Sequence, residues 1–183
     1  MIKKVVTGVI IAGVVVLAGL WAASPVLAGK AIIRAAERGD EAALERLVDF
    51  PALRESMKGE LNDLLVAEMR NDPRVVENGL GGLTTMLAPM FISGAVDTVV
   101  TPQGVAAMVT TAKAPEADGA APLEAANSRD EPDLHKAWGY RSLDVFAITL
   151  TDRDRPQNSL ALLLERRGWF TWQLAAVDLR TEP

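Results

Sequence analysis

The chain has 183 residues, and 49% of them are hydrophobic, which is enough for one ordinary domain with a real core and a short additional segment. It contains no cysteine, which excludes disulfide bonds, thiol catalysis and thiolate metal sites. The 19 basic residues, less Lys3 and Lys4, against 24 acidic residues give the chain after residue 29 a net charge of −7, which argues against nucleic acid or an anionic lipid surface as a partner.

Residues 5–23 form an apolar run without a single charge. At about 1.5 Å per residue this run makes roughly 28 Å of helix, close to the hydrocarbon thickness of about 30 Å. A signal peptide is the competing interpretation, because "MIKK" is a basic start and "VLA" permits cleavage after Ala28. The length of the run favours an uncleaved signal-anchor, so we expect a transmembrane helix over residues 1–24 that binds the inner membrane through residues 5–23.

Lys3 and Lys4 place the amino terminus in the cytoplasm by the positive-inside preference. Residues 25–183 are then a single exported domain, on either interpretation of the apolar run. The absence of cysteine fits a bacterial envelope protein, and the expected location of the domain is the periplasm.

The next stretch predicts several short amphipathic helices. Gly39 is a good helix terminator and Asp40 a good N-cap for "EAALERLV". A second break follows at Asp49, Phe50 and Pro51, where proline ends one helix and suits the first turn of another that continues to "NDP" at 71–73. We interpret this break as a structural joint, with Asp49 as the cap and Phe50 packed into the core.

The end of the chain changes to strand patterns. Residues 79–112 are a weaker helical region in which Thr101 and Pro102 start a last helix, and residues 113 to about 134 have the composition of a mobile linker. "RSLDVFAITLT", "SLALLLERR" and "WFTWQLAAVDLR" then predict a three-stranded antiparallel meander. Helices first and strands last predict an α+β fold.

Four segments together resemble a bacterial family of unknown function, DUF2939. They are "ASPVLA", "GDEAALERLVDFPALRESMKGEL", "VVTPQG" and the strand region "LDVFAITL…LALLLERRGWFTWQLAAVDL". The resemblance covers most of the chain from about residue 23 and implies an architecture and a location. It assigns no activity.

No group of residues predicts catalysis, a metal site or a cofactor. His135 is the only histidine and lies beside the predicted linker, too isolated for a metal site or a catalytic triad. Trp169 and Trp172, three apart on a strand, point to opposite faces, so one suits the core and the other the rim. These tryptophans and Arg54, which follows the joint, are the candidate interaction residues.

The sequence therefore favours a membrane-anchored, non-catalytic binding or scaffold module with a possible envelope protein as partner. The alternative is a carrier of an apolar small molecule or lipid, held in a pocket between helices and sheet. An adaptable lining for such a pocket is available from Met57, Met69, Met86, Met90 and Phe91, although the same residues suit a plain core.

Overall fold

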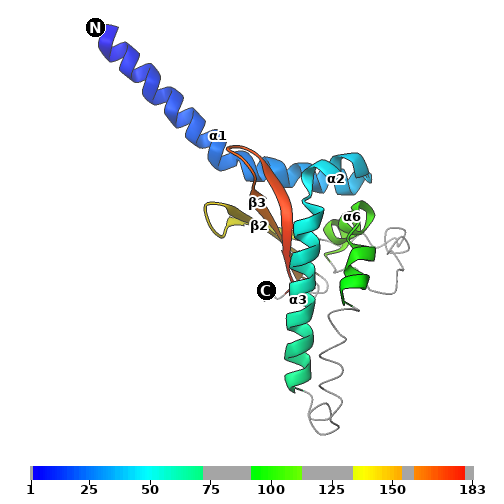
Figure 1. Ribbon diagram of the computed structural model, residues 1–183. Coiled ribbons are helices and arrows are strands. Elements are labelled where there is room, and N and C mark those ends of the chain that lie inside the picture. Colours follow the sequence, from blue (N-terminus) through cyan, green and yellow to red (C-terminus); the bar gives the residue numbers. More distant parts are fainter. Residues whose placement is uncertain (1, 72–91, 113–133, 154–158, 180–183) are drawn as a thin grey trace.

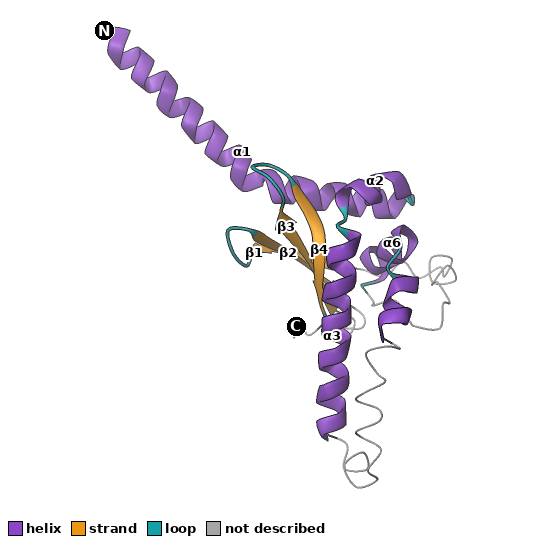
Figure 2. Ribbon diagram, viewed as in Figure 1, coloured by secondary structure: helices purple, strands orange, loops and turns teal. Residues whose placement is uncertain are grey.

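The computed structural model describes residues 2–71, 92–112, 134–153 and 159–179. Its elements are α1 (Ile2–Arg38), α2 (Glu41–Leu47), α3 (Phe50–Asn71), α6 (Pro102–Thr111), β1 (Leu134–Tyr140), β2 (Val145–Asp152), β3 (Ser159–Arg166) and β4 (Trp172–Asp178). The first half of α1 projects away from the other elements, and α3 runs beside β4 (Figures 1 and 2). Helices precede strands, as the α+β prediction requires.

Helix α1 is one unbroken helix of 37 residues, so the prediction of a separate short helix after the apolar run is wrong. It is long and apolar enough to cross a membrane, a judgement from length and composition alone. Its side chains from Val6 to Leu20 are mostly exposed, whereas Ile32 and Ile33 belong to the core. The exposed part of α1 from Val6 to Leu20 is called the bare half below, and the later part of the helix packs on the domain. Helix α1 ends at Arg38, Gly39 follows with a φ of +63° that suits glycine, and Asp40 caps α2 as predicted.

The sheet has four antiparallel strands in the order β1-β2-β3-β4, not the three that the sequence predicted. The missed strand is β1, and its first residue, Leu134, was the last of the predicted linker. Residues 113–133 of that linker lie outside the described residues. Phe146, Ile148 and Leu150, at alternate positions of β2, are all buried.

A bulge in β4 keeps the large side chains of this strand in the core. The register passes from Leu163 opposite Ala176 to Leu164 opposite Leu174, which leaves Ala175 as the extra residue. Trp172 and Leu174 therefore point inward before the bulge and Val177 after it, each no more than 2% exposed. The bulge thus corrects an alternation that would otherwise turn Val177 outward.

Helix α1 approaches the sheet closely at Gly29. A methyl group added there would come within 2.5 Å of Ile148 Cδ1 and 2.6 Å of a ring carbon of Trp138. Only glycine leaves room for the helix at this crossing over β1 and β2. The second half of α1 is therefore a structural part of the domain.

The joint at residues 49–51 also closes the outer edge of β4. Val48 forms a parallel bridge with Leu174, and the amide of Asp49 donates to the carbonyl of Leu174 at 2.8 Å. Further along, the Ser56 hydroxyl accepts from the Val177 amide at 3.1 Å and donates to the Val177 carbonyl at 3.3 Å. An open edge invites pairing with other chains, and this segment occupies it.

Asp49 holds the joint in the way that the sequence predicted, and it makes one contact more. Its Oδ1 accepts from the Ala52 amide at 3.2 Å, which caps α3. Its Oδ2 pairs with Arg167 Nη2 at 2.7 Å, beyond the end of β3. Phe50 is half-buried against the core and Pro51 is exposed in the first turn of α3.

We predict that Asp49→Ala lowers the free energy of unfolding by about 1 to 2 kcal/mol, because it removes a cap and a half-exposed ion pair. Asp49→Asn keeps an accepting oxygen for the cap and should cost less than 1 kcal/mol, roughly the value of a surface ion pair. The measurement is urea unfolding of the full chain in detergent micelles. Equal losses for the two variants would mean that the carboxylate does not act as a cap.

Candidate functional site

The most unusual chemistry in the described residues lies where the bare half of α1 meets the sheet. Pro25 has no amide hydrogen, so the carbonyl of Trp21 loses its helical partner. The Ser24 hydroxyl donates to that carbonyl at 2.7 Å. The Tyr140 hydroxyl, at the end of β1, donates to the next carbonyl, that of Ala22, at 2.9 Å. Side chains thus satisfy the backbone next to the proline.

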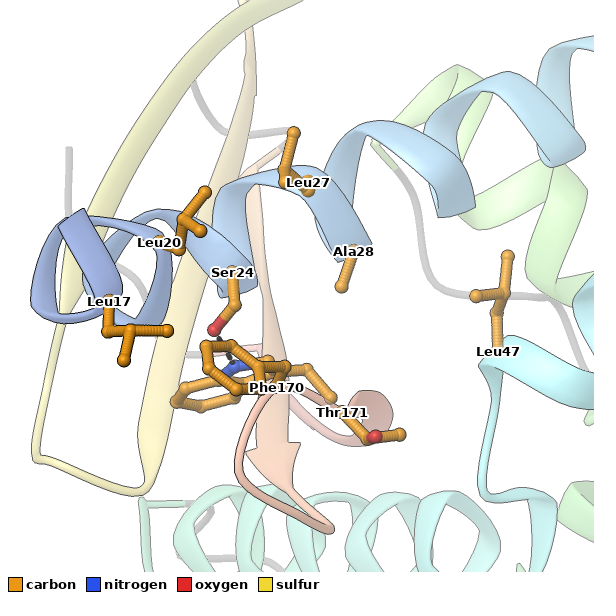
Figure 3. A pocket seen from close by; sticks show the side chains of 9 residues that line it. Leu17, Leu20, Ser24, Leu27, Ala28, Leu47, Phe170 and Thr171 are labelled. Atoms are coloured by element: carbon orange, nitrogen blue, oxygen red, sulfur yellow. Dashed lines mark hydrogen bonds between the residues drawn. The ribbon is translucent and has the colours of Figure 1, made fainter. Parts of the chain in front are cut away.

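Strand β4 is tied to the same point. The indole nitrogen of Trp172 donates to the Ser24 hydroxyl at 2.8 Å, and this bond is buried (Figure 3). Trp172 is 2% exposed, and Ser24 is one of the few buried polar residues. A buried indole N–H without a partner is costly, so Ser24 specifies where β4 contacts the helix.

Arg166 makes a second contact between α1 and the sheet. Its guanidinium carbon lies 4.2 Å from the ring centroid of Trp21 on α1 and 4.2 Å from that of Trp172 on β4. Two cation–π contacts at this distance are favourable, and more so because the Arg166 side chain is only 12% exposed. The same group pairs with Asp144 at 3.2 Å.

A groove runs beside this junction. Its volume is about 550 Å³, and its walls come from α1, from the end of α2 and from residues 170–172 (Figure 3). The lining is almost wholly apolar: Leu17, Leu20, Ser24, Leu27, Ala28, Leu47, Phe170, Thr171 and Trp172. The groove is open to the surface, and it lies between α1, the end of α2 and the start of β4.

The structure separates the three candidate interaction residues. Trp169 is 83% exposed in the turn between β3 and β4, whereas Trp172 is buried and contacts Ser24 and Tyr140. Arg54 is half-buried on α3, where it donates to the Val100 carbonyl at 3.0 Å and lies 5.8 Å from the Phe50 ring. Trp169 is the one of the three that offers most of its side chain to a partner.

Asp97 completes the surroundings of Arg54. It lies 4.0 Å from Arg54 Nε and 3.1 Å from Lys58 Nζ, and so joins α3 to the helical residues 92–99. Its hydrogen bond is the main reason why the pKa of Lys58 is raised above its ordinary value, with a smaller contribution from Glu55. This cluster is far more typical of a packing contact than of a site.

His135 lies on the edge strand β1, paired with Thr151, and not on the loop that was predicted. Among the described residues, no three of the side chains that bind metals come together. Of the methionines considered for a carrier pocket, Met57 is in the core at 1% exposure, away from the groove lining. Met86, Met90 and Phe91 lie outside the described residues, as does the side chain of Met69.

Sequence reasoning missed the residues that make the junction: Ser24, Tyr140 and Arg166. Two of them stand in segments that it quoted, "ASPVLA" and "LERRGWFTW". A serine directly before a proline inside an apolar helix is a usable signal, because such a hydroxyl can replace the lost backbone donor. The contacts of Ser24 with Trp172 and of Arg166 with Trp21 join residues more than 100 positions apart, so no local pattern predicts these two contacts.

The fold and the junction define an α+β domain built around the second half of a long, partly apolar helix. The chain belongs to the family described as "Protein of unknown function (DUF2939)", whose model matches residues 14–108. This match confirms the resemblance, although it begins inside the apolar run and ends before the strands. No curated protein and no solved structure matches the chain.

We predict that Ser24→Ala costs about 1 to 3 kcal/mol of stability, because it leaves the buried Trp172 N–H and the Trp21 carbonyl without their partner. In a Trp172→Phe background the same substitution should cost clearly less, since the indole donor is already gone. The measurement is urea unfolding of the four chains of this cycle in micelles. Thr98→Ala is the matched control, because it removes an exposed hydroxyl that bonds only within its own helix. A Ser24→Ala loss no larger than that of Thr98→Ala would contradict the junction.

Proposed function

We propose that the protein is a single-pass inner-membrane protein of the bacterial envelope, with its amino terminus in the cytoplasm and its domain in the periplasm. The domain is a non-catalytic binding or scaffold module. The observation that carries this proposal is the continuity of α1, whose bare apolar half leads without a break into the core of the domain. A helix built in this way holds a domain at a fixed place on a membrane surface.

Retention of the apolar segment is supported by what its removal would undo. Cleavage after Ala28 would take away the Trp21 ring from Arg166, the Ser24 hydroxyl from Trp172 and the Ala22 carbonyl from Tyr140. Trp172 would be left with an unpaired N–H and an uncovered ring. The family model also begins at residue 14, within the segment that cleavage would discard.

The proposed orientation rests on Lys3 and Lys4 at the amino-terminal end of the apolar run. The binding or scaffold function is supported by the exposed apolar residues on the surface of the domain. The described side chains beneath the sheet, such as Ile148, Leu150 and Leu162, are fully buried in the core.

The groove favours a second candidate, a carrier of an apolar molecule or lipid. Its volume of about 550 Å³ and its apolar walls suit such a ligand. Crosslinking of the membrane-bound protein followed by purification separates the two candidates. One stoichiometric protein partner supports the scaffold, whereas a stoichiometric apolar molecule in an organic extract supports the carrier.

We predict that the protein stays in the membrane pellet after alkaline carbonate treatment, because a retained apolar helix of about 20 residues is not released by charge or pH. Mass spectrometry of the mature protein should find residues 1–28 still attached. A mature chain that begins at Gly29, or full release into the carbonate supernatant, would contradict the anchor.

A further inference from the structure

The exposed apolar residues of the domain gather beside the span. Outside the bare half of α1, the described large hydrophobic residues that are exposed are Leu27, Leu64, Tyr140, Leu143, Trp169 and Phe170. Four of these six belong to the ends of two hairpins, the end of β1 with its turn at 141–144 and the turn at 167–171. These four residues, Tyr140, Leu143, Trp169 and Phe170, are called the hairpin tips below.

Arg166 joins the two turns into one surface. Its Nη2 donates to the Leu143 carbonyl at 2.8 Å, and its Nη1 donates to the Trp169 carbonyl at 3.2 Å. The turns also lie at the same end of the sheet, because the strands of the meander alternate in direction. A group of exposed apolar side chains at one end of a sheet indicates an interaction site.

The position of the hairpin tips along α1 identifies what they meet. Phe170 lines the same groove as Leu17 and Leu20, and Arg166 lies against Trp21. Leu20 is only about 5 Å along the helix from Ala23, where the apolar run ends. If α1 spans the bilayer, the turn at 167–171 is therefore level with the lipid headgroups and the adjoining acyl chains.

We propose that the hairpin tips insert into the leaflet from which α1 emerges, so that the domain contacts the bilayer at a second place beside its anchor. This inference rests on the proposed span. Tryptophan and tyrosine are the side chains that favour the membrane interface. The groove between Phe170 and α1 then opens onto acyl chains and not onto water.

The lipid that fits this surface is an ordinary zwitterionic phospholipid. The contact is apolar and aromatic, and the domain is acidic overall, so no anionic lipid is required. Insertion also explains why Trp169, in its turn, is 83% exposed. The described aromatic residues of the strands pack on one another instead.

Depth measurement on single-cysteine variants tests the proposal, and the absence of native cysteine makes each label unique. The full chain is placed in phosphatidylcholine nanodiscs with a nitroxide on Trp169→Cys or, with Trp169 and Phe170 kept, on Leu143→Cys. His135→Cys, exposed at the opposite end of β1, is the control for water, and Val14→Cys is the control for the span. Collision rates with oxygen and with a water-soluble nickel chelate report depth.

The oxygen-to-nickel ratio at positions 143 and 169 should be several-fold higher than at 135 and should approach the ratio at 14. Ratios at 143 and 169 equal to that at 135, with position 14 in the hydrocarbon, would overturn the inference and leave the anchor standing. A low oxygen-to-nickel ratio at position 14, equal to that at 135, would overturn the proposed membrane anchor together with the inference. Protection of 143 and 169 from both reagents would also overturn it, since a protein surface would then cover the hairpin tips.

Discussion

The hydrogen bond that Pro25 cannot form governs how the domain meets its helix. A proline in the middle of a helix frees a carbonyl and costs about 3 kcal/mol or more unless another donor replaces the lost bond. Here the Ser24 hydroxyl replaces it, and the Tyr140 hydroxyl supports the neighbouring carbonyl. Since Ser24 also accepts from Trp172, the repair of the helix is at the same time the attachment of β1 and β4. The helix continues without a break from the bare half into the core because side chains of the sheet complete its hydrogen bonding next to Pro25.

Residues 48–56 make a second attachment to the sheet, along the edge of β4. They start α3, and they cover the free edge of β4 through Val48 and Ser56. Arg167 connects the two arrangements, because it follows Arg166 directly and pairs with Asp49 at 2.7 Å. The turn after β3 is therefore held from one side by α1 and from the other by the joint. Such a doubly held turn is a rigid place from which to present Trp169.

Local signals predicted much of this fold. Gly39 and Asp40 ended one helix and capped the next, Thr101 capped α6, and the alternation in β2 gave its buried face. Strand β1 was missed because "LHKAWGY" is an edge strand with a glycine and mixed polarity, and its only described neighbour in the sheet is β2. The junction was missed for a different reason. The hydrogen bonds of the junction that join α1 to the sheet connect residues 118 and 148 positions apart, and the sequence marks only one side of them, such as the Ser24-Pro25 pair. The candidate site could therefore be found only from the tertiary structure, whereas most of the secondary structure could be predicted from the sequence.

We infer that Ser24 and Tyr140 fix the domain rigidly to the apolar half of α1 next to Pro25. The most direct test is the distance distribution between two spin labels, one at Val9→Cys on the bare half of α1 and one at His135→Cys on β1, in the full chain in nanodiscs. A rigid junction gives one narrow distribution, and this distribution broadens when Ser24→Ala and Tyr140→Phe are added. A distribution that is already broad without these two substitutions would show that the domain swings freely on its anchor and would contradict the claim.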